Sequence, residues 1–237
     1  MTSRKDTNDK TVLPESTMDD HAHTAIKAVL SAVPIVGGPA AELFAAIIAP
    51  SLALRRDEWL RDLAERLLRL EETVEGFKIE SLTGNDPFVT AVLHATQIAV
   101  RNHNDEKREA LRNAVLNVAA GRAPEEDYQA MFLNFIDTFT PWHIRILRFS
   151  KEINSMAMAK GIDTTGYLAG AVSIVLEGVF DDLKGQREFY DQIVRDLEVR
   201  GLIGMKSLHT MMTGRGIFEK KTTALGDKFL AFITAPT

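Results

Sequence analysis

Apolar side chains recur at helical spacing along most of the chain. The clearest run is Leu60, Leu63, Leu67, Leu70, Val74 and Phe77, whose members are alternately three and four residues apart. This spacing predicts a packing helix that begins near Arg55. Similar patterns, with capping residues and early prolines, predict helices over 87–102, 106–120, from 125 onward, and over 142–153, 188–200 and 227–233. The expected fold class is therefore mainly α, with an N-terminal helical bundle.

Residues 28–54 form an apolar run with a single charged side chain, Glu42. A turn cluster of prolines and glycines at residues 34–39 interrupts any continuous helix, and Pro50 is expected to end the second piece. The longest unbroken stretch, residues 40–49, would be about 15 Å long, against about 30 Å of hydrocarbon in a bilayer. The prediction is a hairpin of two short helices rather than a membrane-spanning helix.

Three roles are open for this hairpin. It can be a buried helix–turn–helix part of the core, a membrane-inserting hairpin that a trigger releases, or a docking surface for a partner. The residues that would contact the membrane or the partner are Pro34, Ile35, Val36, Leu43, Phe44, Ile47 and Ile48. The pattern alone does not choose between the three roles.

The C-terminal part of the chain mixes helices with short strand patterns. Leu202–Ile203 and residues 217–221 are expected to be strands around a loop that contains Gly214 and Gly216. The order of the segments TPWHIRIL, DLEVRGLI and TALGDKFLAFI resembles the winged helix-turn-helix fold over residues 138–235. That resemblance implies a DNA-binding transcription regulator as the alternative function.

The distribution of charge weakens that alternative. Residues 187–200, the helix before the expected wing, hold three arginines against four acidic side chains, so phosphate would repel this helix. The basic residues of the wing would contact the nucleic-acid backbone without reading bases, and they are Lys206, Arg215, Lys220 and Lys221. Nucleic acid is therefore the less favoured partner.

The whole chain also resembles a poorly characterised group of bacterial helical proteins. The segments that carry this resemblance are an apolar PxVGGPxxE segment, RRDEWLRDLAERL, EKREALRNAVLN and TPWHIRIL. The plan is distantly similar to the abortive-infection alpha type of phage-defence protein. The resemblance covers most of residues 24–235 and implies a bacterial, defence-linked role without any catalytic residue.

Composition and motifs exclude several kinds of chemistry. The 237 residues include no cysteine and carry a net charge of −5, so thiol catalysis, cysteine-ligated metals and a general affinity for nucleic acid are not expected. The sequence has no phosphate loop, dinucleotide fingerprint, nucleophile elbow or His-Glu-x-x-His motif. His21 and His23 are best explained by chance, His143 as a capping or packing residue, and Asn113 and Asn117 as structural amides. We therefore expect no catalytic residue, metal, cofactor or small-molecule substrate.

The expected organisation is a polar tail over 1–23, a helical domain with the apolar hairpin over 24–134, and a winged-helix-like domain over 135–237. The expected function is that of a non-enzymatic bacterial interaction protein, a defence-linked effector whose hairpin engages a protein partner or a membrane. Self-association is included among the expected contacts. The expected location is the cytoplasm, with peripheral contact at the inner membrane as an extension of that role.

Overall fold

The computed structural model describes residues 39–166 and 168–236, and side chains from residue 46 onward. The predictions for the polar tail, the two N-terminal histidines and Pro34, Ile35 and Val36 lie outside the described residues. The side chains of Leu43 and Phe44 also lie outside them. The chain divides into two units, residues 1–57 and 58–237.

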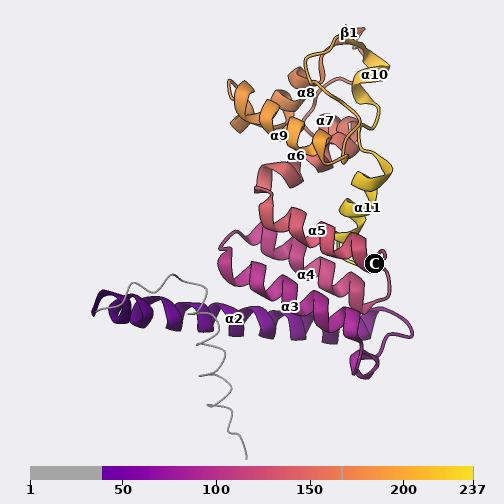
Figure 1. Cartoon of the computed structure of the whole chain (residues 1–237). Coiled ribbons are helices and arrows are strands. Elements are labelled where there is room, and N and C mark those ends of the chain that lie inside the picture. The colour runs from indigo at the N-terminus through magenta and orange to yellow at the C-terminus, as the bar shows by residue number, and fades with distance from the viewer. Residues whose placement is uncertain (1–38, 167, 237) are drawn as a thin grey trace, which may run out of the picture. The chain divides into compact units, whose positions relative to one another are not determined.

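The protein is mainly helical and carries one small two-stranded sheet, which confirms the coarse fold class (Figure 1). The helices and strands, with the 3₁₀ turns labelled η, are α2 (Pro39–Thr73), η1 (Ile79–Leu82), α3 (Asp86–Arg101), α4 (Asp105–Ala119), α5 (Glu126–Thr138), α6 (Pro141–Lys151), α7 (Ile153–Ala159), β1 (Ala169–Gly170), α8 (Val172–Val179), η2 (Asp181–Leu183), α9 (Arg187–Val199), β2 (Met212–Thr213), α10 (Gly214–Phe218) and α11 (Ala224–Phe232).

Helix α2 corrects two predictions. It runs without interruption from Pro39 to Thr73, so Pro50 does not end a helix and no separate helix begins near Arg55. A proline inside a helix removes one backbone hydrogen bond and crowds the carbonyl four residues earlier, but it need not stop the helix. The Ser51 hydroxyl donates to the Ile47 carbonyl oxygen at 3.3 Å, within this turn.

Helices α3 and α4 begin where their capping residues predict. The side chain of Asn85 accepts from the backbone N–H of Phe88, and that of Asn104 accepts from Lys107 N–H, each satisfying a donor that has no partner inside its helix. Helices α3, α4 and α5 lie side by side (Figure 1). The part of α2 from residue 58 packs on this group through Trp59 and Leu63, which are buried with side chains of all three helices.

Most of the predicted apolar run is confirmed, since Leu63, Leu70 and Phe77 are buried and Leu67 and Val74 pack against the core; its first member is the exception. Trp59 is fully buried, whereas Leu60, which was predicted to face the core, is exposed. For α9, the amphipathic pattern predicts an inner face of Phe189, Ile193, Leu197 and Val199. Ile193 and Leu197 are buried, together with Tyr190 and Val194, whereas Phe189 and Val199 are exposed. Spacing predicts a helix and its apolar stripe, but the exact face that is buried depends on the packing partner.

The strands differ from the prediction. Residues 217 and 218 belong to helix α10, because the Thr213 side chain caps Gly216 N–H and starts a helical turn there. The sheet pairs β1 with β2 in antiparallel register, with Ala169 opposite Thr213 and Gly170 opposite Met212. Ile203 forms only a single antiparallel bridge, with Thr222.

The turn before α11 shows why the sequence carries Gly201 and Gly226. Gly201 has a positive φ of 72°, which favours glycine, and its carbonyl accepts from the Thr223 hydroxyl. Thr223 N–H donates to the Leu202 carbonyl at 3.0 Å, and a Cβ at Gly226 would collide with that carbonyl. These contacts attach the start of α11 to the end of α9.

Aromatic rings connect α5, the α5–α6 turn and α11. Phe229 lies 5.3 Å from Phe132 and 5.9 Å from both Phe135 and Phe139, measured between ring centroids. Phe132 also contacts Phe232 at 5.7 Å. The cluster thus joins residues on both sides of the predicted domain limit at 134/135, and the domain limits themselves stay predictions.

Candidate interaction surfaces

The first half of α2 carries exposed aliphatic side chains. Ile47 is 60% exposed and Leu54 is 61% exposed. Because they are seven residues apart, about two helical turns, they project from the same face of the helix. Ile48, another predicted contact residue, is half-buried. Of the predicted apolar site, the described side chains are therefore one exposed and one partly covered isoleucine.

A second apolar surface, on α2 and α3, was not predicted. Leu60, Leu68, Val89 and Leu93 are between 40% and 61% exposed, although each is aliphatic. We call this surface the α2–α3 face. In a sequence, a leucine among charged residues is interpreted as a core position. The α2–α3 face can therefore be recognised only when the packing partner of α2 is known.

The opposite edge of α2 is held to α4 by ion pairs. Arg66 binds both Asp62 at 3.2 Å and Glu109 at 2.9 Å, and Arg112 pairs with Asp62. The Arg112 guanidinium lies 5.6 Å from the centroid of the buried Trp59 ring. Asp62 and Arg66 have the i,i+4 spacing of a helix-surface ion pair, and both also pair with side chains of α4.

The four predicted nucleic-acid contacts have different surroundings. Lys206 is exposed, and Arg215 is 90% exposed while it pairs with Glu219 at 3.2 Å. Lys220 pairs with Asp227 at 2.6 Å, and the Lys221 ammonium donates to the Gly216 carbonyl. Burial lowers the pKa of Lys221. Three of the four cations therefore already have contacts within the fold, although Arg215 stays exposed while it makes its contact.

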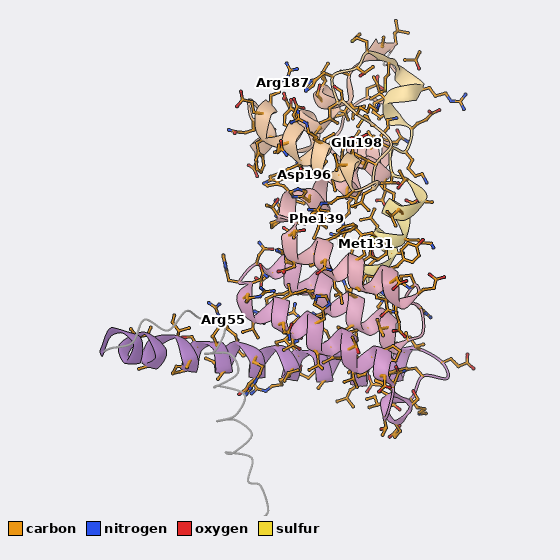
Figure 2. The ribbon with its side chains drawn as sticks, viewed as in Figure 1. Arg55, Met131, Phe139, Arg187, Asp196 and Glu198 are labelled. Carbon is orange, nitrogen blue, oxygen red and sulfur yellow. The ribbon has the colours of Figure 1, made fainter. Side chains whose placement is uncertain are left out.

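His143 lies where α4, α5, α6 and α9 meet. Its Nδ1 accepts from Thr140 N–H at 3.1 Å, which places the ring proton on Nε2, 3.5 Å from Asp196 Oδ2. The imidazole stacks on Phe139 with 4.7 Å between ring centroids. In Figure 2, Asp196 lies on α9 close to Phe139. The predicted capping and packing role of His143 is confirmed.

Burial lowers the pKa of His143, and the nearby Arg200 and Lys107 act in the same direction, while Asp196 opposes them. Lys107 is itself buried, with its ammonium donating to the Asp137 carbonyl at 2.8 Å at the end of α5. The imidazole has a hydrogen-bond partner or close polar contact at each nitrogen, which suits a structural group better than a catalytic base.

A second histidine–carboxylate pair is more accessible. His209 Nε2 lies 2.8 Å from Asp191 Oδ1, and Arg187 lies 3.5 Å from the other oxygen of that carboxylate. The neighbouring Tyr190 hydroxyl donates to Glu177 at 2.8 Å, and burial with this contact raises the pKa of Tyr190 to about 12. Across residues 39–166 and 168–236, no three histidine, aspartate or glutamate side chains gather into a metal-binding group.

Neither of two hollows on the described surface contains a histidine. The larger, about 420 Å³, is lined by Asn154, two threonines and side chains of α10 that include Arg215. The smaller, about 300 Å³, is lined by Arg148, Lys151 and residues of α7 and α11. Neither brings together a nucleophile, a base and a group that orients the base.

Asn113 and Asn117 serve α11. The Asn113 amide donates to the Ile233 carbonyl at 3.1 Å, and the Asn117 amide lies 2.9 Å from Phe232 O and 2.8 Å from Thr234 O. They supply donors to carbonyls at the C-terminal end of α11, which have no partner inside the helix. This confirms the predicted structural role of the two amides.

In the part of the chain that the structure describes, no helix combines the length and hydropathy that a bilayer crossing requires. No protein-family model, curated protein or solved structure matches this chain, so the resemblances to winged-helix and phage-defence proteins stay predictions.

Proposed function

We propose that the chain is a non-enzymatic interaction protein that binds an apolar target, a partner protein or a lipid surface, through the apolar run of residues 28–54, which includes the first half of α2. The observation that carries the proposal is the exposure of Ile47 and Leu54 on one helical face. Aliphatic side chains exposed together on a helix are typical of an interaction site.

The residues around this face agree with a target that is apolar at its centre. Pro50 is also exposed, between Ile47 and Leu54, and charge returns only at Arg55, Arg56 and Asp57. Arg56 pairs with Asp57 at 3.0 Å, which reduces the net positive charge beside the apolar face. The proposal includes a role in bacterial defence, which rests on the sequence resemblance.

The test compares the Ile47→Asp/Leu54→Asp variant with a Met158→Asp control, since Met158 is as exposed as Leu54 but lies on α7. Hydrogen exchange over residues 39–57 is measured with and without liposomes that contain anionic lipid, together with flotation. Lipid-dependent protection in the wild type, lost only in the double variant, supports a lipid surface. A protein target is supported by a different result: no variant floats with the liposomes, and the wild type and the control retain a bacterial protein that the double variant does not retain. Identical behaviour of all three proteins in both assays contradicts the proposal.

For the C-terminal part we propose a winged-helix-like arrangement that serves protein contacts rather than DNA. The order β1, α8, α9 and β2, with β1 pairing to β2, supports the resemblance. The acidic side chains of α9 and the internal contacts of Lys220 and Lys221 favour a role other than DNA binding. A gel shift with random duplex tests this: salt-sensitive binding that a Lys206→Glu/Arg215→Glu variant abolishes would instead support the DNA-binding alternative.

A further inference from the structure

The α2–α3 face has an internal symmetry that can be derived from one hydrogen bond. Trp59 Nε1 on α2 donates to Thr96 Oγ1 on α3 at 3.0 Å. Both residues lie far from the connection through η1, so the two helices run antiparallel along each other. Moving eight residues toward the connection on each helix places Leu67 opposite Phe88, and both side chains border the same two core clusters. The shared surroundings of Leu67 and Phe88 agree with the register that the Trp59–Thr96 hydrogen bond sets.

In the sequence, each of the four exposed aliphatic residues comes directly after a residue whose side chain faces inward. Leu60 and Leu68 come directly after Trp59 and Leu67 on α2. On α3, Val89 follows Phe88 and Leu93 follows Val92, and both preceding side chains pack against the core. When two right-handed helices pack antiparallel, the residue that follows a contact residue projects about 100° further around its helix. On both helices that rotation leads to the same side of the pair. The four side chains therefore share one surface.

This surface is self-complementary about its centre. Ala64, which is exposed, lies midway between Leu60 and Leu68. In the register set by Trp59 and Thr96, Ala64 is opposite residue 91 of α3, which is midway between Val89 and Leu93. A two-fold axis that lies in the surface, passes through this point and is perpendicular to the helices would place Leu60 on Leu68 and Val89 on Leu93 of a second copy. The small side chain of Ala64 allows the two α2 helices to approach closely at the axis.

The charges beside the surface obey the same symmetry. Arg61 and Glu65 are exposed and flank Ala64 on the edge of α2 that faces away from α3. The same two-fold axis brings Arg61 of each copy beside Glu65 of the other, which gives two opposite-sign contacts across one interface. An isologous dimer requires this kind of self-complementarity, whereas an anionic membrane or nucleic acid would favour a rim of one positive sign.

We propose that the α2–α3 face is the interface of a two-fold symmetric dimer, in which two antiparallel helix pairs stack face to face as a four-helix bundle. The inference stands apart from the proposed binding of an apolar target, because it uses different residues, all of them within the unit of residues 58–237. Helix pairs with an apolar surface on one side are stabilised when they pack against another such pair.

The first test uses the absence of cysteine from the wild type. In the full-length Ala64→Cys variant, the only thiols of the two copies would meet at the axis, within the Cα separation of about 4.4–6.8 Å that a disulfide requires. Mild oxidation is expected to convert this variant to a covalent dimer. The Ser155→Cys control, exposed on α7, is expected to stay monomeric on a denaturing gel. Equal cross-linking of both variants, or none in either, overturns the proposal.

The second test measures mass by sedimentation. Wild type is expected to be a dimer at micromolar concentration, and Leu68→Glu is expected to be a monomer with unchanged circular dichroism. Ile174→Glu on α8 is the matched control, since Ile174 is 57% exposed and Leu68 is 56% exposed. The control is expected to stay dimeric. A wild type that remains a monomer at roughly 100 μM, a concentration well above that of a specific dimer's dissociation constant, would falsify the interface.

Charge reversal adds a rescue that simple loss of folding cannot imitate. Arg61→Glu is expected to raise the dimer dissociation constant roughly tenfold, because the introduced carboxylate would then face Glu65 of the other copy. The Arg61→Glu/Glu65→Arg variant restores opposite signs and is expected to recover the wild-type constant. Failure of this recovery contradicts the two-fold register. The Ile47→Asp/Leu54→Asp variant should remain a dimer, so failure of this inference and failure of the proposed function give different results.

Discussion

A single imidazole makes the junction of α5, α6 and α9 sensitive to acid. His143 is buried and stacked on Phe139, and its Nδ1 must be unprotonated to accept from Thr140 N–H. The charged groups that face it are Asp196 and Arg200 on α9 and Lys107 on α4. A proton on Nδ1 would break the cap of α6 and add a third cation to the two that are already there.

The consequence is a loss of stability at acid pH. Because burial lowers the pKa of His143 in the folded state, the unfolded chain binds a proton below the ordinary pKa of 6.5 while the folded chain does not. The free energy of unfolding is therefore expected to fall as pH drops below 6.5, by at most about 1.4 kcal/mol per pH unit from this group. Urea denaturation of wild type and His143→Gln between pH 7 and pH 5 measures it. The variant should be less stable at pH 7 but show the shallower decrease; parallel curves would contradict the role of His143.

At the scale of an element, α2 contains a weak turn at Pro50. The missing N–H leaves the carbonyl of Ala46 without its helical donor, and proline costs about 3 kcal/mol more than alanine inside a helix. Pro50→Ala is expected to slow hydrogen exchange of the amides at 51–54 by roughly 100-fold, where local opening governs exchange. A Ser51→Ala variant controls for the hydroxyl that bonds to Ile47 O. Unchanged exchange in Pro50→Ala would mean that this turn is held by contacts stronger than helix propensity.

Capping residues predicted helix starts well, whereas the strand and helix-stop signals failed where a helix forms instead. Asn85, Asn104 and Thr223 mark helix starts correctly because a cap acts within three residues of itself. Residues 217–218 failed as a strand because Thr213, in the preceding segment, caps a helical turn there. Pro50 failed as a stop because the helix continues on both sides of it.

The candidate surfaces show the same division. The aliphatic character of Ile47 is visible in the sequence, but the exposure of Leu60, Leu68 and Leu93 depends on which side of α2 the ion pairs of Asp62 and Arg66 turn toward α4. The pairs to α4, Arg66 with Glu109 and Asp62 with Arg112, connect residues more than 40 positions apart. Spacing alone assigns Leu60 to the core, and only packing shows that it is exposed together with Leu68 and Leu93.

At the scale of the whole molecule, the aromatic cluster decides whether residues 58–237 behave as one cooperative structure. The rings that Phe229 contacts, those of Phe132, Phe135 and Phe139, lie on both sides of the predicted domain limit at 134/135. Asn113 and Asn117 add hydrogen bonds from α4 to the end of α11. Because α11 contacts both α4 and α6, its loss should weaken both parts of this unit together.

Phe229→Ala tests this coupling, because the chain has two tryptophans that report on different helices, Trp59 on α2 and Trp142 on α6. Truncating a fully buried phenylalanine is expected to cost about 3–5 kcal/mol. In Trp59→Phe and Trp142→Phe backgrounds, the denaturant midpoints seen by the remaining tryptophan should fall together. Val199→Ala, at an exposed position, should leave both midpoints unchanged. If Phe229→Ala shifts the Trp142 transition while the Trp59 transition stays in place, the helices before residue 135 unfold as a separate domain, and the predicted limit at 134/135 is correct.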